Sequence, residues 1–316
     1  MKKVLIFGVS GFVGGYLSRE FIEHGYSVIG TDRVRSSGLP SEVGFFESDL
    51  LETEKIESLV NRIQPDIIVN LAAISSVGAS WSIPQTTMQV NVVGALNIME
   101  AAKKSGKKPK ILFVGSSEEY VISDFPMSED CPLNASNPYG ISKVTQEQFA
   151  KLYRDQYGLK VYYVRPFNHT GVGQRDSFVL PSFCKQVAEI EKSGKPGTIN
   201  VGNLTVKRDF SHVKDIVRAY RMIVESDHCE KIYNVGSGTA YSLEKMLQYV
   251  VGLSRQKIQI EVDTTRYRPT DQPIICCDRH LIKEELGWEP QYTVFDALKE
   301  MFEYFKGLNE DNTWRG

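Results

Sequence analysis

The chain has 316 residues, with 37 Lys and Arg against 39 Asp and Glu, which gives a formal net charge of −2. Hydrophobic residues make up 41% and charged residues 24%, the proportions of an ordinary globular domain. These values exclude a disordered chain, a fibrous repeat and a strongly basic nucleic-acid-binding protein as starting interpretations. No apolar run approaches the roughly 20 residues of a membrane span, and Val4–Phe7 is too short for the core of a signal peptide.

The cysteines and histidines show no pattern of a metal or disulfide site. Five cysteines, at positions 131, 184, 229, 276 and 277, form no CxxC pair, and the five histidines are scattered. Spacings of this kind are typical of reduced thiols and not of a structural zinc site. We therefore expect a cytoplasmic protein with no bound metal.

Short β-branched runs alternate with amphipathic stretches through the first half of the chain. In chain order, the predicted strands are Val4–Phe7, Ser27–Gly30, Gly44–Glu47, Asp66–Leu71, Lys110–Val114 and Lys160–Arg165. Helical spacing of apolar residues predicts helices over Phe12–His24, Pro84–Lys104 and Pro138–Tyr157. This alternation predicts an α/β fold of the Rossmann type, a doubly wound parallel sheet with helices on both faces.

After Arg165 the pattern becomes looser. Loops rich in Gly, Asn and Pro separate shorter helices, which predicts a smaller second lobe. Ile232–Val235 is a further apolar run, so the segment around it is expected to return to the first domain. We predict a first domain over residues 1–165 plus about 211–235, and a C-terminal lobe over about 166–210 and 236–316.

A glycine-rich segment, Gly8–Gly14, lies directly between the first predicted strand and the first helix. Gly8 permits a tight turn, Gly11 allows the backbone to approach a pyrophosphate, and Gly14 lets the helix pack on the sheet. The start of the helix, with Phe12 and Val13, supplies free N–H groups for phosphates. This segment predicts that the first domain binds NAD(P)H.

Asp32 ends the second predicted strand, where a carboxylate can bind the ribose hydroxyls of NAD. Arg33 and Arg35 follow and could hold the 2′-phosphate of NADP instead, so the choice between the two cofactors stays open. Further cofactor contacts are predicted at the carboxyl ends of other strands, namely Asp49, Leu50, Leu71, Ala72, Ala73 and Arg165.

Tyr139 and Lys143 are spaced by four residues on a predicted helix and therefore share a face. A cationic Lys next to a phenol is expected to lower the phenol pKa, so that Tyr139 can exchange a proton with a carbonyl or alcohol oxygen. Ser116 follows the fifth strand and can hydrogen-bond the same oxygen. Glu118, two residues later, is a second candidate acid. Together these residues predict a catalytic site at the edge of the sheet.

The whole chain resembles the extended short-chain dehydrogenase/reductase family. The resemblance rests on the glycine segment, on Ser116, Tyr139 and Lys143, and on the stretches Asn70–Ala73, Asn91 and Arg208–Val213. Within the family, the chain is most similar to reductases of GDP-4-keto-6-deoxy-D-mannose, through the stretches Gly115–Tyr120, Arg165–Gly171, Phe178–Phe183, Val201–Phe210 and Arg268–Asp271. Val121 and Val172 stand where the family pattern has Gly and Pro, in loops near the expected substrate.

The resemblance implies a Ser116–Tyr139–Lys143 triad that reduces the C4 ketone of this GDP-sugar to GDP-D-rhamnose with NAD(P)H. It implies substrate contacts in the second lobe, for which we select Asn168, Lys185, Arg208 and Arg268. It also implies a homodimer formed by the helices over 84–104 and 138–157, unless these helices only cover the sheet. The composition and charge predict neither a nucleic acid nor a membrane as partner.

Two other functions stay open. Glu118 has the spacing of the glutamate that acts in sugar-nucleotide dehydratases, so a GDP-mannose 4,6-dehydratase or a 4-epimerase on the same fold is the alternative. A nucleotide sensor without activity is the least favoured interpretation, because a sensor would be marked by loss of Tyr139 or Lys143.

Overall fold

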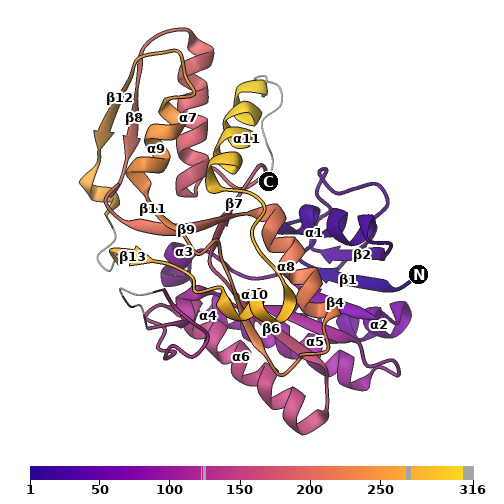
Figure 1. The fold of residues 1–316 in the computed structure, drawn as a ribbon. Coiled ribbons are helices and arrows are strands. Elements are labelled where there is room, and N and C mark those ends of the chain that lie inside the picture. The colour runs from indigo at the N-terminus through magenta and orange to yellow at the C-terminus, as the bar shows by residue number, and fades with distance from the viewer. Residues whose placement is uncertain (122, 124–125, 268–271, 309–316) are drawn as a thin grey trace.

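The computed structural model describes residues 1–121, 123, 126–267 and 272–308 and shows a large lobe and a small lobe (Figure 1). Within these residues, the large lobe has a seven-stranded sheet in the order β10-β6-β5-β4-β1-β2-β3, with every pairing parallel. Its strands are β1 (Lys3–Phe7), β2 (Ser27–Asp32), β3 (Gly44–Glu47), β4 (Ile67–Asn70), β5 (Lys110–Val114), β6 (Val161–Pro166) and β10 (Ile232–Val235).

Helices cover both faces of this sheet. One face packs on α1 (Phe12–Glu23), α8 (Val213–Glu225) and α10 (His280–Leu286). The other face packs on α2 (Thr53–Ile63), α5 (Gly94–Lys104) and α6 (Pro138–Tyr157). The predicted Rossmann-type, doubly wound parallel sheet is therefore confirmed.

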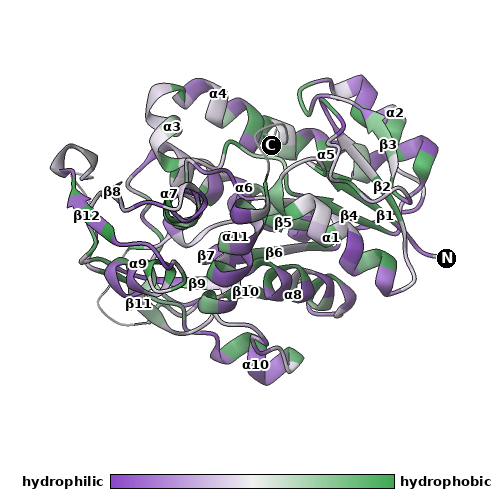
Figure 2. Cartoon of the chain, turned by 90° about the horizontal axis from the view of Figure 1, so that it is seen from above, coloured by the Kyte–Doolittle hydropathy of each residue, from purple (hydrophilic) through white to green (hydrophobic). Residues whose placement is uncertain are grey.

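The central strand β1 shows why the sequence folds this way. Successive side chains of a strand point to opposite faces. Val4 and Ile6 pack with Leu17 and Phe21 of α1, whereas Leu5 and Phe7 pack against α2 and α5. Both sets are buried, so the strand is apolar from Val4 to Phe7, and its neighbours are coloured hydrophobic in Figure 2 as well.

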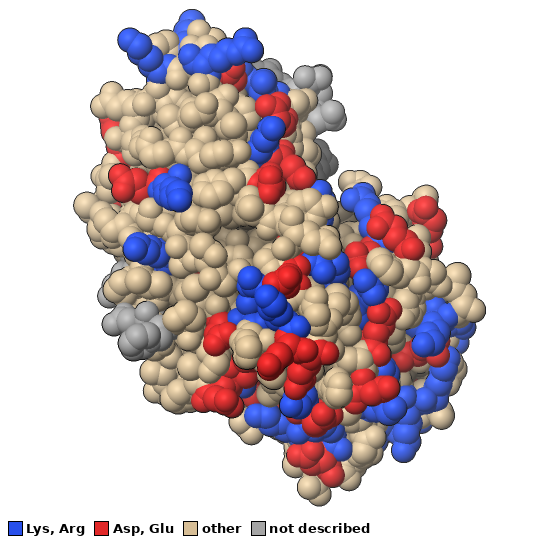
Figure 3. Space-filling view, viewed as in Figure 1, with Lys and Arg blue, Asp and Glu red and all other residues tan. Residues whose placement is uncertain are grey.

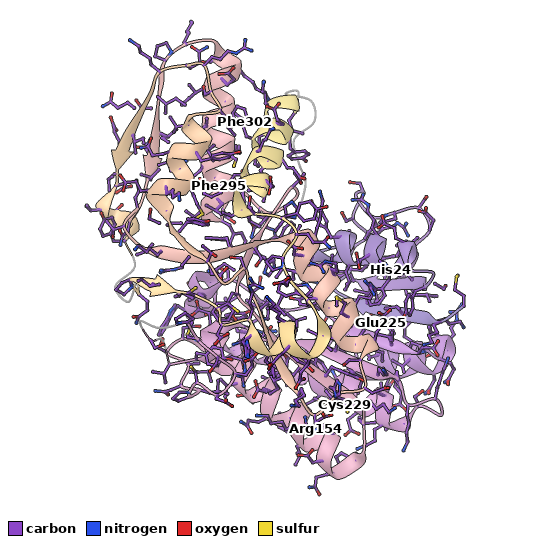
Figure 4. All side chains as sticks on the ribbon, viewed as in Figure 1. His24, Arg154, Glu225, Cys229, Phe295 and Phe302 are labelled. Carbon is purple, nitrogen blue, oxygen red and sulfur yellow. The ribbon has the colours of Figure 1, made fainter. Side chains whose placement is uncertain are left out.

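The small lobe is built from three helices and several short strands. α7 (Val179–Ser193), α9 (Leu243–Val251) and α11 (Val294–Gly307) enclose one apolar core, to which Phe302 contributes from α11 (Figure 4). The strands are β7 (Asn168–Thr170), β8 (Gly197–Val201), β9 (Lys207–His212), β11 (Ala240–Ser242), β12 (Ile258–Val262) and β13 (Ile274–Ile275). The parallel pair β8 and β12 flanks the helices, and β9 pairs with β7, β11 and β13.

The segment between the two parts of the small lobe returns to the large lobe, as its apolar run predicts. β10 pairs with β6 in parallel, with Tyr233 opposite Val164. The loop before β10 is held by Arg154 near the end of α6, whose guanidinium donates to the carbonyls of Cys229 and Glu230 (Figure 4). The strand prediction for Ile232–Val235 is confirmed.

The predicted single helix over Pro84–Lys104 is wrong in one respect. It consists of α4 (Pro84–Met88), a π-helical turn η1 (Gln89–Val93) and α5. The Asn91 amide bonds the backbone of Ile74 and the Ser142 hydroxyl, while the Asn91 carbonyl accepts from Gln146 Nε2. These bonds to other segments compensate the wider turn, a distortion that is frequent at functional sites.

The surface and the side-chain chemistry add three observations. Acidic and basic side chains are interspersed over the large lobe on the face drawn in Figure 3. In the described part of the chain, no helix is long and apolar enough to cross a membrane, and no group of three or more His, Cys, Asp or Glu side chains could hold a metal ion. All five cysteines are free thiols.

Candidate active site

The glycine segment forms a tight loop between β1 and α1. Gly8 has a φ of 76°, and a Cβ atom there would lie 2.6 Å from the backbone nitrogen of Ala72. A Cβ atom at Gly14 would lie 2.0 Å from the carbonyl oxygen of Val9. Both positions therefore require glycine, the first for its dihedral angle and for close approach to the chain after β4, the second for helix packing.

This loop has the backbone features that a dinucleotide requires. Gly11 is the N-cap of α1 and makes no side-chain cap, so no capping side chain takes up the first N–H groups of the helix. These donors and the positive end of the helix suit a diphosphate. The residues present therefore fit NAD(P), with Gly11, Phe12 and Val13 as the candidate phosphate contacts.

Asp32 is the last residue of β2, next to the glycine loop. Its carboxylate accepts from the backbone N–H groups of Ser10 at 3.2 Å and Arg33 at 2.8 Å. Arg35 points away, because its guanidinium donates to the Val43 carbonyl and lies 5.7 Å from the Phe45 ring centroid. The carboxylate thus faces the loop, whereas Arg35 is occupied beside β3.

We expect Asp32→Ala to shift the affinity ratio towards NADPH, because the carboxylate can bind ribose hydroxyls and repels a 2′-phosphate. Titration of the variant and the unaltered protein with NADH and NADPH, followed by nicotinamide fluorescence, measures the ratio. The same ratio in both proteins would show that Asp32 does not contact the ribose.

Three predicted catalytic residues come together at the carboxyl end of β5. Ser116 lies two residues after the strand and caps the 3₁₀ turn η2 (Ser117–Glu119), while Tyr139 and Lys143 lie in the first two turns of α6. All three are buried, and the Lys143 Nζ atom lies 5.9 Å from the Tyr139 ring centroid. Lys143 donates to the Val114 carbonyl at 2.7 Å.

Burial controls the titration of this pair. It raises the pKa of Tyr139 above its usual value; the Ser116 hydroxyl opposes the rise, whereas the neighbouring carboxyl groups of Glu119 and Glu118 add to it when they are ionised. Burial also lowers the pKa of Lys143 to about 8, against the opposing effect of Glu119. The expected lowering of the Tyr139 pKa by Lys143 is therefore wrong for this structure, because loss of solvation is the largest effect on the phenol.

Glu118 lies next to this group and is half-buried. One carboxylate oxygen accepts from Asn137 Nδ2 at 2.8 Å. The same Asn137 side chain caps α6 by accepting from the Gly140 N–H. Asn137 therefore fixes Glu118 relative to the helix that carries Tyr139 and Lys143.

With this geometry established, comparison with known proteins identifies the family. The sequence model described as GDP-mannose 4,6 dehydratase matches residues 5–301. The chain belongs to the GDP-mannose 4,6 dehydratase family. It is an NAD(P)-dependent nucleotide-sugar enzyme of the extended short-chain dehydrogenase/reductase type.

Similar members of the GDP-mannose 4,6 dehydratase family and its structural neighbours carry two kinds of name. GDP-6-deoxy-D-mannose reductase of Pseudomonas aeruginosa is 27% identical over 301 residues, covering 94% of this chain and 95% of the reductase. GDP-mannose 4,6-dehydratase of Yersinia enterocolitica is 29% identical over 348 residues, covering 95% and 93%. The structure of RMD from Pseudomonas aeruginosa complexed with NADPH is 25% identical, with a TM-score of 0.85 and coverage of 97% and 99%.

The predicted cofactor contact of Arg165 stays a prediction, and its side chain is engaged by other protein groups. Arg165 is buried and forms two bonds of 2.8 Å with the Glu147 carboxylate. Its remaining nitrogen donates to the Tyr120 hydroxyl and the Glu129 carbonyl. The guanidinium thus holds α6 and the chain after η2 onto β6, and all three nitrogens are occupied by protein.

The other predicted cofactor contacts lie after the carboxyl ends of strands, as their positions in the sequence predict. Asp49 and Leu50 follow β3, and the Leu50 side chain packs against Gly94 of α5. Leu71, Ala72 and Ala73 follow β4 and are half-buried. Their contacts with the cofactor stay predictions, as do those of Arg33, which is exposed.

The predicted substrate residues are spread over the small lobe. Asn168 lies on β7, which pairs with β9 next to Arg208, and the Arg208 guanidinium donates to the carbonyls of Lys207 and Gln272. Lys185 lies on α7 and forms an exposed ion pair of 2.6 Å with Asp176. Arg268 lies outside the described residues.

Sequence reasoning missed the polar residues behind the triad. Gln146 Nε2 donates to the backbone carbonyl of Asn91, and the Gln146 Oε1 atom lies 3.4 Å from Lys143 Nζ. Glu119 accepts the backbone N–H of Ser116. A signal was available for Gln146, because it lies three residues after Lys143 on the same predicted helix and therefore shares its face. Glu119, in the short turn after β5, gave no such signal.

Proposed function

We propose that the protein reduces the C4 ketone of GDP-4-keto-6-deoxy-D-mannose with NAD(P)H and forms GDP-D-rhamnose. The observation that supports this proposal is that the chain aligns with the reductase over a shorter span, with fewer gaps, than with the dehydratase. That alignment spans 301 residues, whereas the dehydratase alignment spans 348 for the same share of this chain. The Yersinia enterocolitica dehydratase therefore has insertions within the aligned region that this chain and the reductase lack.

The side chains at the end of β5 have the chemistry for ketone reduction. The bound nicotinamide would supply hydride to C4. Tyr139 gives its phenolic proton to the carbonyl oxygen as that oxygen becomes an alcohol. The Ser116 hydroxyl, which faces the same phenol, orients the carbonyl. Lys143 is a cation below about pH 8, and its Nζ atom lies 5.9 Å from the centroid of the ring on which the phenolate is left after proton transfer.

The small lobe offers polar groups for the GDP moiety. Arg208 presents a planar guanidinium, which suits two-point contact with a diphosphate. Asn168 lies on the strand that pairs with β9 and can bond either the diphosphate or the sugar. Lys185 is the weaker candidate, because Asp176 competes for its ammonium group.

A GDP-mannose 4,6-dehydratase is the second candidate, and Glu118 is the observation that favours it. The carboxylate is half-buried, is fixed by Asn137, and is close enough to raise the pKa of Tyr139. A carboxylate in this place can act on the sugar in an elimination of water. The same carboxylate is compatible with a reductase, in which it only shapes the site.

One pair of assays tests the two candidates. Purified protein is mixed with NADPH and GDP-4-keto-6-deoxy-D-mannose, and the absorbance of the reduced nicotinamide is followed. A parallel sample contains GDP-mannose alone and is examined by mass spectrometry for loss of water. A reductase consumes NADPH in the first assay and leaves GDP-mannose intact, whereas a dehydratase gives the opposite result.

We also propose that the enzyme is a homodimer through α6 and the neighbouring π turn. Ile141 and Leu152 of α6 lie eleven residues apart, about three helical turns, and therefore share a face. Both are exposed, and Val93 of η1 is exposed as well. We expect Ile141→Glu combined with Leu152→Glu to give a monomer in analytical ultracentrifugation, and an unchanged mass would place the interface elsewhere.

A further inference from the structure

Glu119 is a fully buried acid that the mechanism above does not use. Its Oε1 atom accepts the backbone N–H of Ser116 at 2.7 Å, and the Tyr163 hydroxyl lies 3.3 Å away. A Cβ atom at Gly115 would lie 2.3 Å from the same Oε1. The chain is thus built closely around this carboxyl group, which links the catalytic serine to β6.

The second oxygen of Glu119 has a different environment. Among the described residues, no donor reaches its Oε2 atom. The side chain of Glu147 lies within hydrogen-bonding reach of the Glu119 carboxyl group. Two carboxylates are both acceptors, so a hydrogen bond between them needs a proton on one of them. Glu147 is bound by Arg165 and by Lys151 Nζ at 2.8 Å. The proton therefore belongs on Glu119.

We propose that Glu119 is a neutral carboxylic acid that shares its proton with Glu147 and acts as a positioning residue for Ser116. In this form it holds the serine backbone and adds no second negative charge next to Tyr139 and Lys143. The effect on turnover rests on the proposed function. The protonation state does not, because it follows from the buried contacts alone.

The electrostatics of the neighbouring elements agree with this assignment. Burial and then the Glu147 charge raise the pKa of Glu119, with Arg165 in opposition. Although burial alone would raise the pKa of Glu147, its bonds to Arg165 and Lys151 hold that pKa below its usual value. The titratable groups that face Glu119 are Tyr139, Lys143 and Glu147 from α6 and Tyr163 and Arg165 from β6.

Ionisation of Glu119 at alkaline pH would therefore act on the active site. The new charge raises the pKa of Tyr139 and of Lys143, as the interactions of both groups with Glu119 indicate. It also breaks the proton bridge to Glu147. Glu119→Gln is the matched test, because the amide stays neutral at every pH, accepts from Ser116 and can donate to Glu147.

The first measurement is the pH profile of kcat. We expect Glu119→Gln to retain kcat near that of the unaltered enzyme at pH 7 and to lose less activity on the alkaline side. Glu119→Leu removes both bonds of the carboxyl and is expected to lower kcat by about 10- to 100-fold through displacement of Ser116. If Glu119→Gln is as impaired as Glu119→Leu at every pH, Glu119 acts as an anion and the proposal fails.

The second measurement does not depend on the reaction. An acid whose pKa is raised in the folded state adds stability fully below its unfolded pKa of about 4.3, and this stability is lost as pH rises through the folded pKa. The urea midpoint of the unaltered protein should therefore fall relative to that of Glu119→Gln between about pH 5 and 8. Glu54→Gln, at an exposed position of α2, is the control. Its urea midpoint should change with pH in the same way as that of the unaltered protein.

Infrared spectroscopy gives a direct signature of the proton. A protonated carboxylic acid has a C=O stretching band that a carboxylate lacks, and Glu119→Gln should remove one such band at neutral pH. The proposal would be overturned if the unaltered protein and Glu119→Gln had equal urea midpoints across the pH range, or if Glu119→Gln lost no C=O band. Either result would hold whether or not the protein reduces a sugar. Failure of the reductase assay alone would leave these two results unchanged.

Discussion

Replacement of Tyr139 by Phe is expected to abolish turnover while cofactor affinity stays close to that of the unaltered enzyme. The substitution removes only the phenolic oxygen, which is the proposed proton donor, and the loss of a general acid costs about 10²- to 10⁴-fold in rate. Tyr139 is buried, and its hydroxyl faces that of Ser116. Initial rates measure the first effect, and fluorescence titration with NADPH measures the second.

Tyr153→Phe is the matched control, because Tyr153 lies on the same helix and its hydroxyl bonds Glu100, far along α6 from the triad. The initial rate of this variant should equal that of the unaltered enzyme. Substantial activity in Tyr139→Phe would assign the proton donor to another group, with Glu118 as the nearest acid to examine.

Replacement of Arg165 by Leu is expected to reduce the free energy of unfolding by about 3–5 kcal/mol. The guanidinium is the two-point partner of the buried Glu147, and its loss leaves that carboxylate next to Glu119 with only Lys151. Urea denaturation at neutral pH measures the loss.

Lys104→Met is the control for this substitution, since it breaks the exposed ion pair with Glu57. Exposed pairs contribute at most about 1 kcal/mol, so this variant should unfold close to the unaltered protein. Equal midpoints for Arg165→Leu and Lys104→Met would show that the buried pair contributes little. A weakened cofactor affinity in the folded fraction of Arg165→Leu would support the cofactor role predicted from the sequence.

The architecture of the large lobe follows from patterns that the sequence displays. β1 is buried and apolar from Val4 to Phe7, and the glycine segment after it includes Gly8 and Gly14, where a side chain would clash with the backbone. α6 begins at Pro138 and ends at Tyr157, as predicted, because Asn137 caps its start and Gly158 takes up the left-handed conformation at its end.

Features that depend on contacts between distant segments could not be predicted in the same way. The π turn at Asn91 exists because its side chain and carbonyl bond residues of a loop and of α6. The short strands β7 and β9 pair across forty residues and carry mixed polar side chains with no period. The partner of Arg165 likewise lies on another element, and a charged residue at a strand end gives no sign of whether it faces a ligand or a buried acid.

The path of the chain has a consequence for how this enzyme can change during evolution. The polypeptide leaves the large lobe after β6, returns for α8 and β10, leaves again, and contributes α10 before it ends in α11 of the small lobe (Figure 1). A single genetic break at any of these crossings would remove a layer from one core and leave part of the other core uncovered. Neither lobe can therefore be exchanged by a single end-to-end recombination.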